Sequence, residues 1–200
     1  MPQVITYILG GSLYINMTNR CTCDCDFCER NNSDSVGDAE SLWLDYEPSR
    51  EEILESINSR DLTQFTELVF CGFGEPMLRA KDLLWVARQI KQISPLPVRI
   101  NTNGHGNIIA GYDITPEMSG IIDRLSISLN RADAVKYNKH IRPVFGSGAF
   151  EQMLDFVKKA KNFVPEITLT VLDLLSQEEI TSCREIAENL GVGFRVRATH

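Results

Sequence analysis

The sequence predicts an α/β fold: a partial (β/α)6 barrel of the TIM type, open, with an N-terminal hairpin. Three observations predict it: short apolar runs alternate with amphipathic segments, helix-capping patterns separate them, and polar motifs follow the strand ends. Strands that alternate with helices form a parallel sheet with right-handed crossovers. Six such units are too few to close the usual eight-stranded barrel. A flat, doubly wound sheet is the alternative that this pattern does not separate from an open barrel.

The first two strands are expected to pair as a hairpin around Gly10-Gly11. The expected strands cover residues 4–9, 13–17, 67–71, 98–102, 125–129, 167–171 and 194–197. Helices are expected over 49–59, 80–92, 148–162 and 176–190, with a short one starting near Pro116. Capping boxes begin the first and last of the four longer helices, formed by Ser49 with Glu52 and by Ser176 with Glu179. Residues 29–47 are interpreted as an irregular polar insertion, and 131–147 as a loop.

Composition narrows the class of protein. The 200 residues predict a single domain over 1–200, with a net charge of -7 that argues against binding a phosphate backbone. No apolar run approaches the ~20 residues that span a membrane. The N-terminus, residues 1–4, lacks the features of a secretory signal, so a cytoplasmic location is expected. Thiols stay reduced in that compartment, where clustered cysteines more often bind metal than form disulfides.

The candidate metal-binding motif is a cysteine loop directly after the second expected strand. Cys21, Cys25 and Cys28 form a C-x3-C-x2-C set with the aromatic Phe27 before its last member. Three thiolates can hold three irons of a four-iron, four-sulfur cube and leave the fourth iron open for chemistry. A structural zinc site is the alternative, although such sites close with four ligands, often as two separated pairs. Cys23 lies between two of these cysteines, and its C-x-C spacing could also bind iron or zinc.

Polar motifs follow three further strands of the predicted sheet. They are Gly72–Pro76, Asn101–Gly104, and Ser128 with Asn130. Because the carboxyl ends of parallel strands lie at one edge, these motifs are expected to converge with the cysteine loop. Gly72-Phe73-Gly74-Glu75 is a weak match to a dinucleotide fingerprint, since Met77 stands where the third glycine would be. A plain turn is the other alternative for this stretch.

Together these motifs resemble the radical S-adenosylmethionine (radical SAM) superfamily over most of the chain. The resemblance is carried by the cysteine loop, Gly72-Phe73-Gly74-Glu75-Pro76, Asn101-Thr102-Asn103-Gly104 and Ser126-Ile127-Ser128-Leu129-Asn130. Within the superfamily the chain most resembles a small subgroup associated with TatD-type hydrolases. That likeness rests on Leu42-Trp43-Leu44, Glu47-Pro48-Ser49, Tyr137 and Ile141-Arg142-Pro143.

The resemblance implies an enzyme with Cys21, Cys25 and Cys28 as its catalytic residues and the metal ligands of a [4Fe-4S] cluster. It also implies that Cys23 is a spacer whose side chain need not face the cluster. S-adenosylmethionine would bind the open iron and be cleaved reductively to a 5′-deoxyadenosyl radical, which takes hydrogen from an unknown substrate. The implied partners are an external electron donor, such as flavodoxin or ferredoxin, and a small-molecule or protein substrate. A non-catalytic iron–sulfur or zinc module for electron transfer or interaction is the alternative function.

The resemblance also implies which residues bind the cofactor: Phe27, Gly72, Phe73, Gly74, Glu75, Asn103, Ser128 and Asn130. The superfamily binds the methionine amino group with backbone carbonyls of the glycine-rich stretch, where Phe73 replaces a usual glycine and could narrow the pocket. Glu75 is expected to order this turn. The polar side chains at the strand ends could meet the ribose or the methionine carboxylate, or serve as turn residues satisfied by backbone.

Three further residues have open roles. Arg195 and Arg197 alternate along the last strand and either reach a carboxylate at the barrel mouth or lie exposed at a sheet edge. His105 stands between two glycines in a predicted rim loop and could touch substrate. The segments 29–47 and 131–147 are the expected determinants of the substrate, whose identity the sequence does not decide.

Overall fold

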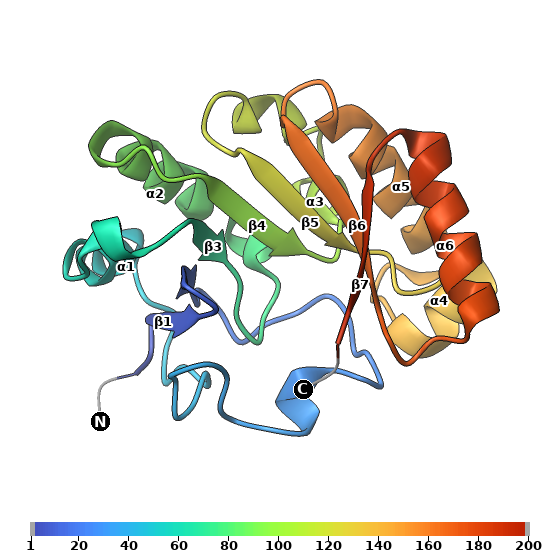
Figure 1. Cartoon of the computed structure of the whole chain (residues 1–200), viewed down its shortest axis with the longest axis horizontal. Coiled ribbons are helices and arrows are strands. Elements are labelled where there is room, and N and C mark those ends of the chain that lie inside the picture. The colour runs from blue at the N-terminus through green and yellow to red at the C-terminus, as the bar shows by residue number, and fades with distance from the viewer. Residues whose placement is uncertain (1–2, 199–200) are drawn as a thin grey trace.

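The computed structural model describes residues 3–198 and contains a seven-stranded sheet in the order β1-β2-β3-β4-β5-β6-β7 (Figure 1). β1 (Thr6–Leu9) and β2 (Ser12–Ile15) form the predicted antiparallel hairpin, and β2 to β7 are parallel. The remaining strands are β3 (Leu68–Phe70), β4 (Val98–Thr102), β5 (Arg124–Ser128), β6 (Glu166–Leu172) and β7 (Gly193–Arg197). A doubly wound sheet would reverse its strand order, so the sequential order confirms the partial, open barrel.

The helices follow the prediction with two additions. They are α1 (Arg50–Asn58), α2 (Ala80–Ile93), α3 (Gly106–Ala110), α4 (Ala134–Ile141), α5 (Ala149–Ala160) and α6 (Gln177–Leu190). The short helix expected near Pro116 is a 3-10 turn over Thr115–Met118. α3 and α4 were not predicted; α4 lies inside the segment interpreted as a loop and buries only Tyr137 and Ile141. Within residues 3–198, no helix has the length and apolar character required to cross a membrane.

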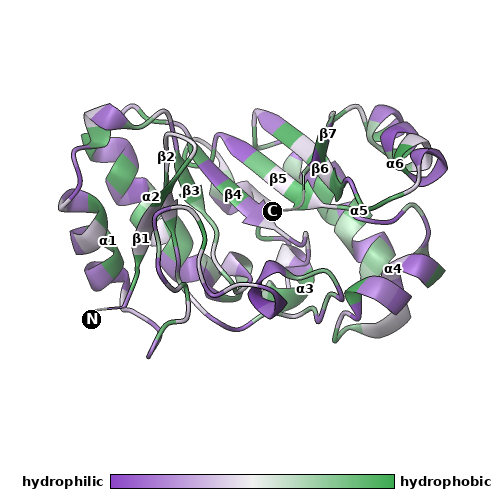
Figure 2. Ribbon diagram, turned by 60° about the horizontal axis from the view of Figure 1, so that its bottom comes forward, coloured by the Kyte–Doolittle hydropathy of each residue, from purple (hydrophilic) through white to green (hydrophobic). Residues whose placement is uncertain are grey.

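The parallel strands present different residues to their two faces. In β4, Val98, Ile100 and Thr102 are buried, whereas Arg99 and Asn101 alternate with them and are only partly buried. Figure 2 shows this alternation of apolar and polar residues along the central strands. Successive side chains of a strand point to opposite faces, so the apolar set packs beneath the helices and the polar set lines the inner face of the half-barrel.

Helix starts show how far local patterns decide structure. Ser49 and Glu52 form the complete predicted capping box of α1. Ser176 accepts the N–H of Glu179 at the start of α6, but only this half of the second box is present. The Glu179 carboxylate instead accepts a hydrogen bond from Lys136 Nζ at 3.1 Å, because α4 brings that ammonium group beside it.

Two glycines after β3 are required by close contact with the chain that leads into the cysteine loop. A Cβ atom on Gly74 would lie 2.2 Å from the carbonyl oxygen of Thr18 and 2.5 Å from that of Arg20. A Cβ atom on Gly72 would lie 2.1 Å from Asn16 Oδ1. The glycines therefore let two segments of protein meet, whatever contact they also make with a ligand.

We expect Gly74→Ala to lower the free energy of unfolding by about 1–3 kcal/mol, the usual cost of overpacking, because backbone atoms must move to admit the methyl group. Gly148→Ala is the matched control: its Cβ would meet only Gln152 Nε2, at 4.0 Å, and its φ is -83°. Urea unfolding of both variants measures the difference. Equal stability of the two variants would contradict the close contact.

Candidate active site

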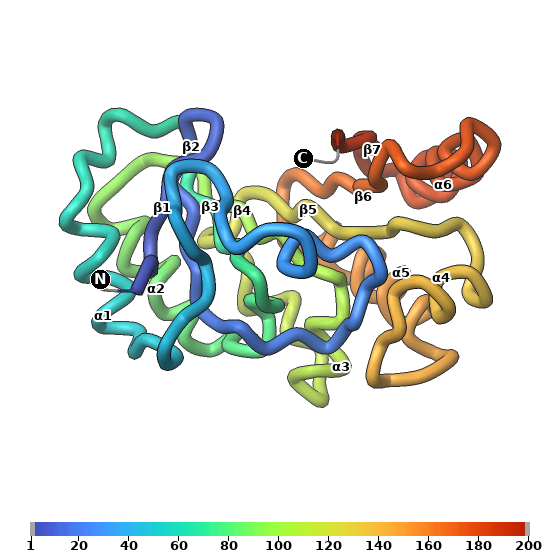
Figure 3. The backbone as a smooth tube through the Cα atoms, turned by 90° about the horizontal axis from the view of Figure 1, so that it is seen from below, coloured from blue at the N-terminus to red at the C-terminus, as the bar shows by residue number. Residues whose placement is uncertain are grey.

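The cysteine loop lies at the carboxyl ends of the parallel strands. It follows β2 and belongs to the stretch 16–47, which Figure 3 shows crossing the sheet edge from the hairpin toward α4. The structure thus brings the loop to the same edge as the turn after β3 and the ends of β4 and β5, as the sequence predicted. Three groups of contacts fix the loop there.

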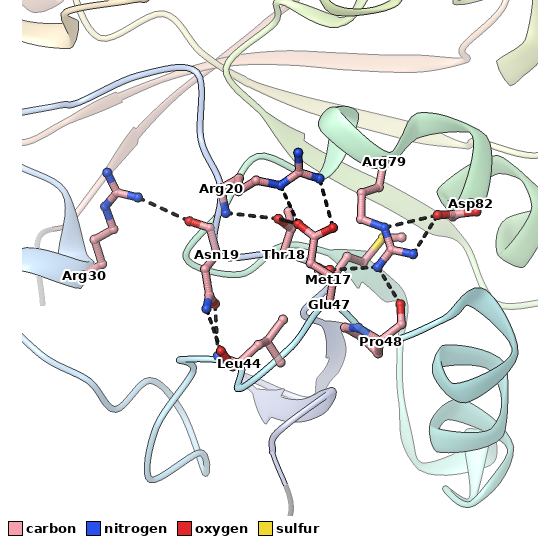
Figure 4. Close-up of polar contacts among 10 residues, drawn as sticks. All are labelled: Met17, Thr18, Asn19, Arg20, Arg30, Leu44, Glu47, Pro48, Arg79 and Asp82. Atoms are coloured by element: carbon pink, nitrogen blue, oxygen red, sulfur yellow. Dashed lines mark hydrogen bonds and ion pairs between the residues drawn. The ribbon is translucent and has the colours of Figure 1, made fainter.

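The insertion holds the stem of the loop through polar contacts (Figure 4). Glu47 accepts a hydrogen bond from Thr18 Oγ1 at 2.5 Å and forms a two-point ion pair with Arg20, at 2.6 and 2.9 Å. The side chain of Asn19 donates to the carbonyl of Leu44 at 2.8 Å and accepts the N–H of that residue at 3.0 Å. A two-point contact of this kind fixes orientation as well as distance.

Arg79 adds a second clamp that the sequence analysis did not identify. Its Nη1 donates to the carbonyl oxygens of Met17 at 3.0 Å and Pro48 at 2.6 Å, while Asp82 pairs with Nη2 at 2.6 Å (Figure 4). The guanidinium is one-tenth exposed, so water competes weakly for these bonds. In the sequence, only the position of Arg79 shortly after the Gly-Phe-Gly-Glu-Pro turn could have suggested this role.

The segment that ends α4 fixes the loop from the opposite side. Backbone hydrogen bonds of 2.9–3.1 Å join alternate loop residues to this segment: Thr22 to Val144, Asp24 to Ile141, and Asp26 to His140. Arg142 also contacts the Asp24 carboxylate at 3.1 Å, and His140 contacts that of Asp26 at 2.7 Å. These contacts use residues 22, 24 and 26, and the Cys25 thiol adds a longer contact of 3.9 Å to the carbonyl of Ile141.

The three candidate ligand thiols are half-buried and form no disulfide. Hydrogen bonding from Cys23 lowers the pKa of Cys21 to about 6, toward the thiolate form that binds metal. Burial raises the pKa of the Cys28 thiol. Within residues 3–198, no three His, Cys, Asp or Glu side chains gather as a site for a single metal ion. A four-iron cube takes its thiolates at three separate corners, so its ligands need not converge on one point.

Cys23 faces into the protein. The residue is 5% exposed, and its sulfur accepts a hydrogen bond from Asn103 Nδ2 at 3.3 Å and lies 3.8 Å from His105 Nδ1. Hydrogen bonds with Cys21 and Cys25, together with burial, raise the pKa of Cys23. A buried, protonated thiol directed at side chains beneath the loop fits a spacer.

The prediction that His105 could touch substrate from a rim loop is wrong. The ring is 1% exposed and lies between Cys23 and Tyr137, whose hydroxyl is 3.1 Å from Nε2. Burial lowers the pKa of His105 to about 4. Gly106 beside it allows close packing against Phe156, so the glycine marks a tight contact in place of an exposed turn.

Glu75 joins the turn after β3 to the end of β4. Its buried carboxylate accepts hydrogen bonds from the N–H groups of Met77 at 3.0 Å and Asn103 at 2.7 Å, and from Thr102 Oγ1 at 2.7 Å. The N–H of Glu75 itself donates to the carbonyl of Arg20 at 2.8 Å. Burial raises the pKa of Glu75 to about 7, although the three hydrogen bonds act in the opposite direction.

The polar strand-end residues divide into two kinds. The Asn103 side chain is engaged within the protein, since it donates to Thr22 Oγ1 at 2.8 Å and accepts the N–H of His105 at 3.0 Å. Asn130 has a left-handed backbone with φ 56°, and its Oδ1 is buried without a hydrogen-bond partner among the described residues. Ser128 is partly exposed, and no side-chain hydrogen bond engages its Oγ within residues 3–198. These two side chains fit a bound polar ligand.

The aromatic residues of the motifs have different surroundings. Phe27 packs against the main core, and the guanidinium of Arg131 lies 5.7 Å from its ring centroid. Phe73 is 6% exposed in a small cluster with Leu42, and its ring meets that of Trp43 edge-on at 5.0 Å. Phe73 therefore anchors the insertion, and the expectation that it could narrow the pocket is not what the structure shows.

The donor set at this edge fits a thiolate-bound cluster with a polar cofactor beside it. Three free thiols, an orphaned amide oxygen at Asn130 and an unengaged hydroxyl at Ser128 lie on the loop and the strand ends. The backbone that carries the thiols is held mainly by residues 22, 24 and 26 and by the stem of the loop.

We expect the contribution of Glu75 to stability to fall as pH rises, because a buried carboxyl with a raised pKa favours the protonated folded state. The contribution is complete below pH 4.5 and lost as pH passes about 7. It amounts to about 3 kcal/mol at 1.36 kcal/mol per pKa unit. Urea unfolding of wild type and Glu75→Gln at pH 5 and pH 8 measures it, with the exposed Glu151→Gln as control. A pH dependence that Glu75→Gln leaves intact would contradict this assignment.

The fold is similar to that of several solved radical SAM proteins. SuiB from Streptococcus suis, solved with the precursor peptide SuiA and also with S-adenosylmethionine, matches with a TM-score of 0.69 and 14% identity in its peptide complex, over 95% of this chain and 39% of that chain. A radical SAM methyltransferase from Sphaerobacter thermophilus matches with a TM-score of 0.65 and 11% identity, over 98% of this chain and 69% of that chain. TsrM from Kitasatospora setae, a radical S-adenosylmethionine methyltransferase solved with cobalamin and a [4Fe-4S] cluster, matches with a TM-score of 0.56 and 12% identity. The match covers 93% of this chain and 34% of that chain.

A local likeness to one curated protein covers less of the chain. The GTPase Obg of Brachyspira hyodysenteriae is 32% identical over 104 residues, which are 50% of this chain and 15% of that protein. Residues 15–189 match the Radical SAM superfamily. This match contains the cysteine loop, the turn after β3 and the ends of β4 and β5. The chain therefore belongs to the radical SAM superfamily.

Proposed function

We propose that the protein is a radical SAM enzyme that reductively cleaves S-adenosylmethionine at a [4Fe-4S] cluster held by Cys21, Cys25 and Cys28. The observation that carries the proposal is the cysteine loop itself: three free thiols on a backbone held by the insertion and the end of α4, at the edge where ligands of such sheets bind. A reduced cluster, when bound, supplies the electron that breaks the sulfur–C5′ bond and yields a 5′-deoxyadenosyl radical, which takes hydrogen from the substrate.

The residues of the chain have distinct tasks in this proposal. The Gly72–Glu75 turn offers backbone carbonyls to the methionine amino group, and Glu75 keeps that turn against β4 through its three hydrogen bonds. Asn130 Oδ1 accepts a hydrogen bond from a polar group of the cofactor, and Ser128 Oγ accepts or donates one. Asn103 and His105 act from beneath the loop, where they orient Cys23.

We also propose membership of the TatD-associated subgroup. Three of its characteristic stretches contact the cysteine loop or its stem: Leu44 bonds to Asn19, Glu47 to Arg20, and Ile141 to Asp24. Tyr137 reaches the loop only through His105. The residues typical of the subgroup would then be those that hold the cysteine loop in place. A shared structural role for these separate stretches supports the proposal.

The remaining parts of the proposal concern partners. The electron comes from an external donor such as flavodoxin or ferredoxin, and the location is cytoplasmic. The substrate is a small molecule or a protein that reaches the inner face of the sheet. A passive iron–sulfur or zinc module would have no use for the orphaned acceptor at Asn130, which favours the enzyme.

We expect anaerobically reconstituted protein to convert S-adenosylmethionine to 5′-deoxyadenosine and methionine when dithionite is added. Replacing Cys21, Cys25 or Cys28 by alanine should abolish this product and lower bound iron, because each removes a cluster ligand. Liquid chromatography with mass spectrometry measures the product, and iron and sulfide assays measure the cluster.

Cys23→Ala is the matched control, since it removes a thiol from the same loop but one that faces Asn103 and His105. It should keep its iron and most of its activity. An equal loss of iron and activity in all four variants would contradict the ligand assignment. Absence of 5′-deoxyadenosine from wild-type protein that carries a full cluster would contradict the proposed reaction.

A further inference from the structure

The inner face of the sheet carries a group of polar side chains below the cysteine loop. They occupy alternate positions of their strands or the residue just beyond a strand: Tyr14, Cys71, Arg99, Asn101, Arg195 and Arg197. Arg197 interacts electrostatically with Cys71, Tyr14 and Arg99, which shows that β7 brings its arginine across to β2, β3 and β4. Cys71 directly precedes Gly72, so the group lies next to the turn proposed to hold the cofactor.

Positive charge exceeds negative charge on this face. Arg99 pairs with Glu67 at 2.8 Å, and Arg124 pairs with Glu67 at 3.2 Å and with Glu166 at 2.9 Å. Arg195 and Arg197 have no carboxylate partner within residues 3–198. Arg195 also lines a cavity of about 120 Å³ that contains the paired groups.

Several polar atoms of the group are buried without a partner. Arg197 Nε, Arg99 Nε and Asn101 Oδ1 make no hydrogen bond within the described residues. Burial lowers the pKa of Arg197, which is the signature of a guanidinium withdrawn from water without a compensating carboxylate. A native protein rarely leaves buried donors such as the two Nε–H groups unused, and a partly buried guanidinium without a carboxylate partner fits a site whose anion arrives with a ligand.

We propose that Arg197, Arg195 and Arg99 form an anion-binding subsite that takes a carboxylate or phosphate group of the substrate. This assignment rests on the proposed radical SAM function, because it places the bound substrate beside the Gly72–Glu75 turn. The planar guanidinium binds an oxyanion through two parallel N–H groups, and Tyr14 OH, which accepts a hydrogen bond from Arg99 Nη2 at 3.3 Å, adds a further donor. The substrate is therefore an acid or a phosphate ester and not a neutral heterocycle.

Inorganic phosphate is the first probe, used on the whole chain without a cluster. Isothermal titration at constant ionic strength, with chloride as the replaced ion, should give saturable binding at one site. Arg197→Gln should weaken it by about tenfold to a hundredfold, the loss expected for a charge-assisted pair. Arg195→Gln should also weaken it, and Arg88→Gln on the exposed face of α2 should not.

Thermal unfolding separates loss of the site from loss of the fold. Phosphate should raise the midpoint of wild type and of Arg88→Gln but not that of Arg197→Gln. Without phosphate, Arg197→Gln should unfold at or above the wild-type temperature, since it removes an unpaired charge. Phosphate binding that persists in both Arg197→Gln and Arg195→Gln, or no saturable binding by wild type, overturns the proposal.

A second arm distinguishes the substrate from the cofactor as the source of the anion. The cluster signal of reconstituted, reduced protein is titrated with S-adenosylmethionine by electron paramagnetic resonance. An unchanged midpoint in Arg197→Gln supports a substrate subsite, whereas weakening equal to that for phosphate assigns the arginines to the methionine carboxylate and overturns it. If wild type binds phosphate but its cluster never responds to S-adenosylmethionine, the proposed function fails and the substrate assignment fails with it, while the anion site stands.

Discussion

The site depends on one constraint: the cysteine loop is held mainly by contacts of residues other than its three candidate ligands, and Cys25 Sγ adds only a long contact of 3.9 Å to the carbonyl of Ile141. Alternate residues 22, 24 and 26 bond to the end of α4, and the stem is bound by Glu47 and Arg79. A loop whose shape depended on its metal would form only with the metal present. Here the protein supplies much of the shape, so that thiols can be presented to a cluster on a preformed edge.

The contacts that hold the loop also connect it to the turn after β3 and to the end of β4, which are separate motifs in the sequence. Gly74 allows the turn after β3 to touch the stem, and Glu75 ties that turn to β4. Asn103 extends from β4 to Cys23, so the turn, the strand end and the loop form one connected network. A change at any one of them is expected to move the thiols as well as the cofactor carbonyls.

The fold and the place of the site could be predicted because both leave local marks. Apolar runs at strand length and the spacing of the cysteines are visible within short windows. The contacts that hold the loop could not be predicted in this way. His140 and Asp26 lie 114 residues apart in the sequence, and α4 buries too few residues to show a helical pattern. His105 was misplaced because its flanking glycines suggested an exposed turn, whereas Gly106 allows tight packing.

We propose that the loop carries a cube of iron and sulfide with one corner open to S-adenosylmethionine. Electron–nuclear double resonance on the reduced, cluster-loaded protein, with the cofactor labelled with ¹⁵N at the methionine amino group, detects that open corner. We expect a nitrogen hyperfine coupling that appears only when the cofactor is added. A cluster that shows no such coupling at saturating cofactor, or tetrahedral zinc bound by the same thiols, would contradict it.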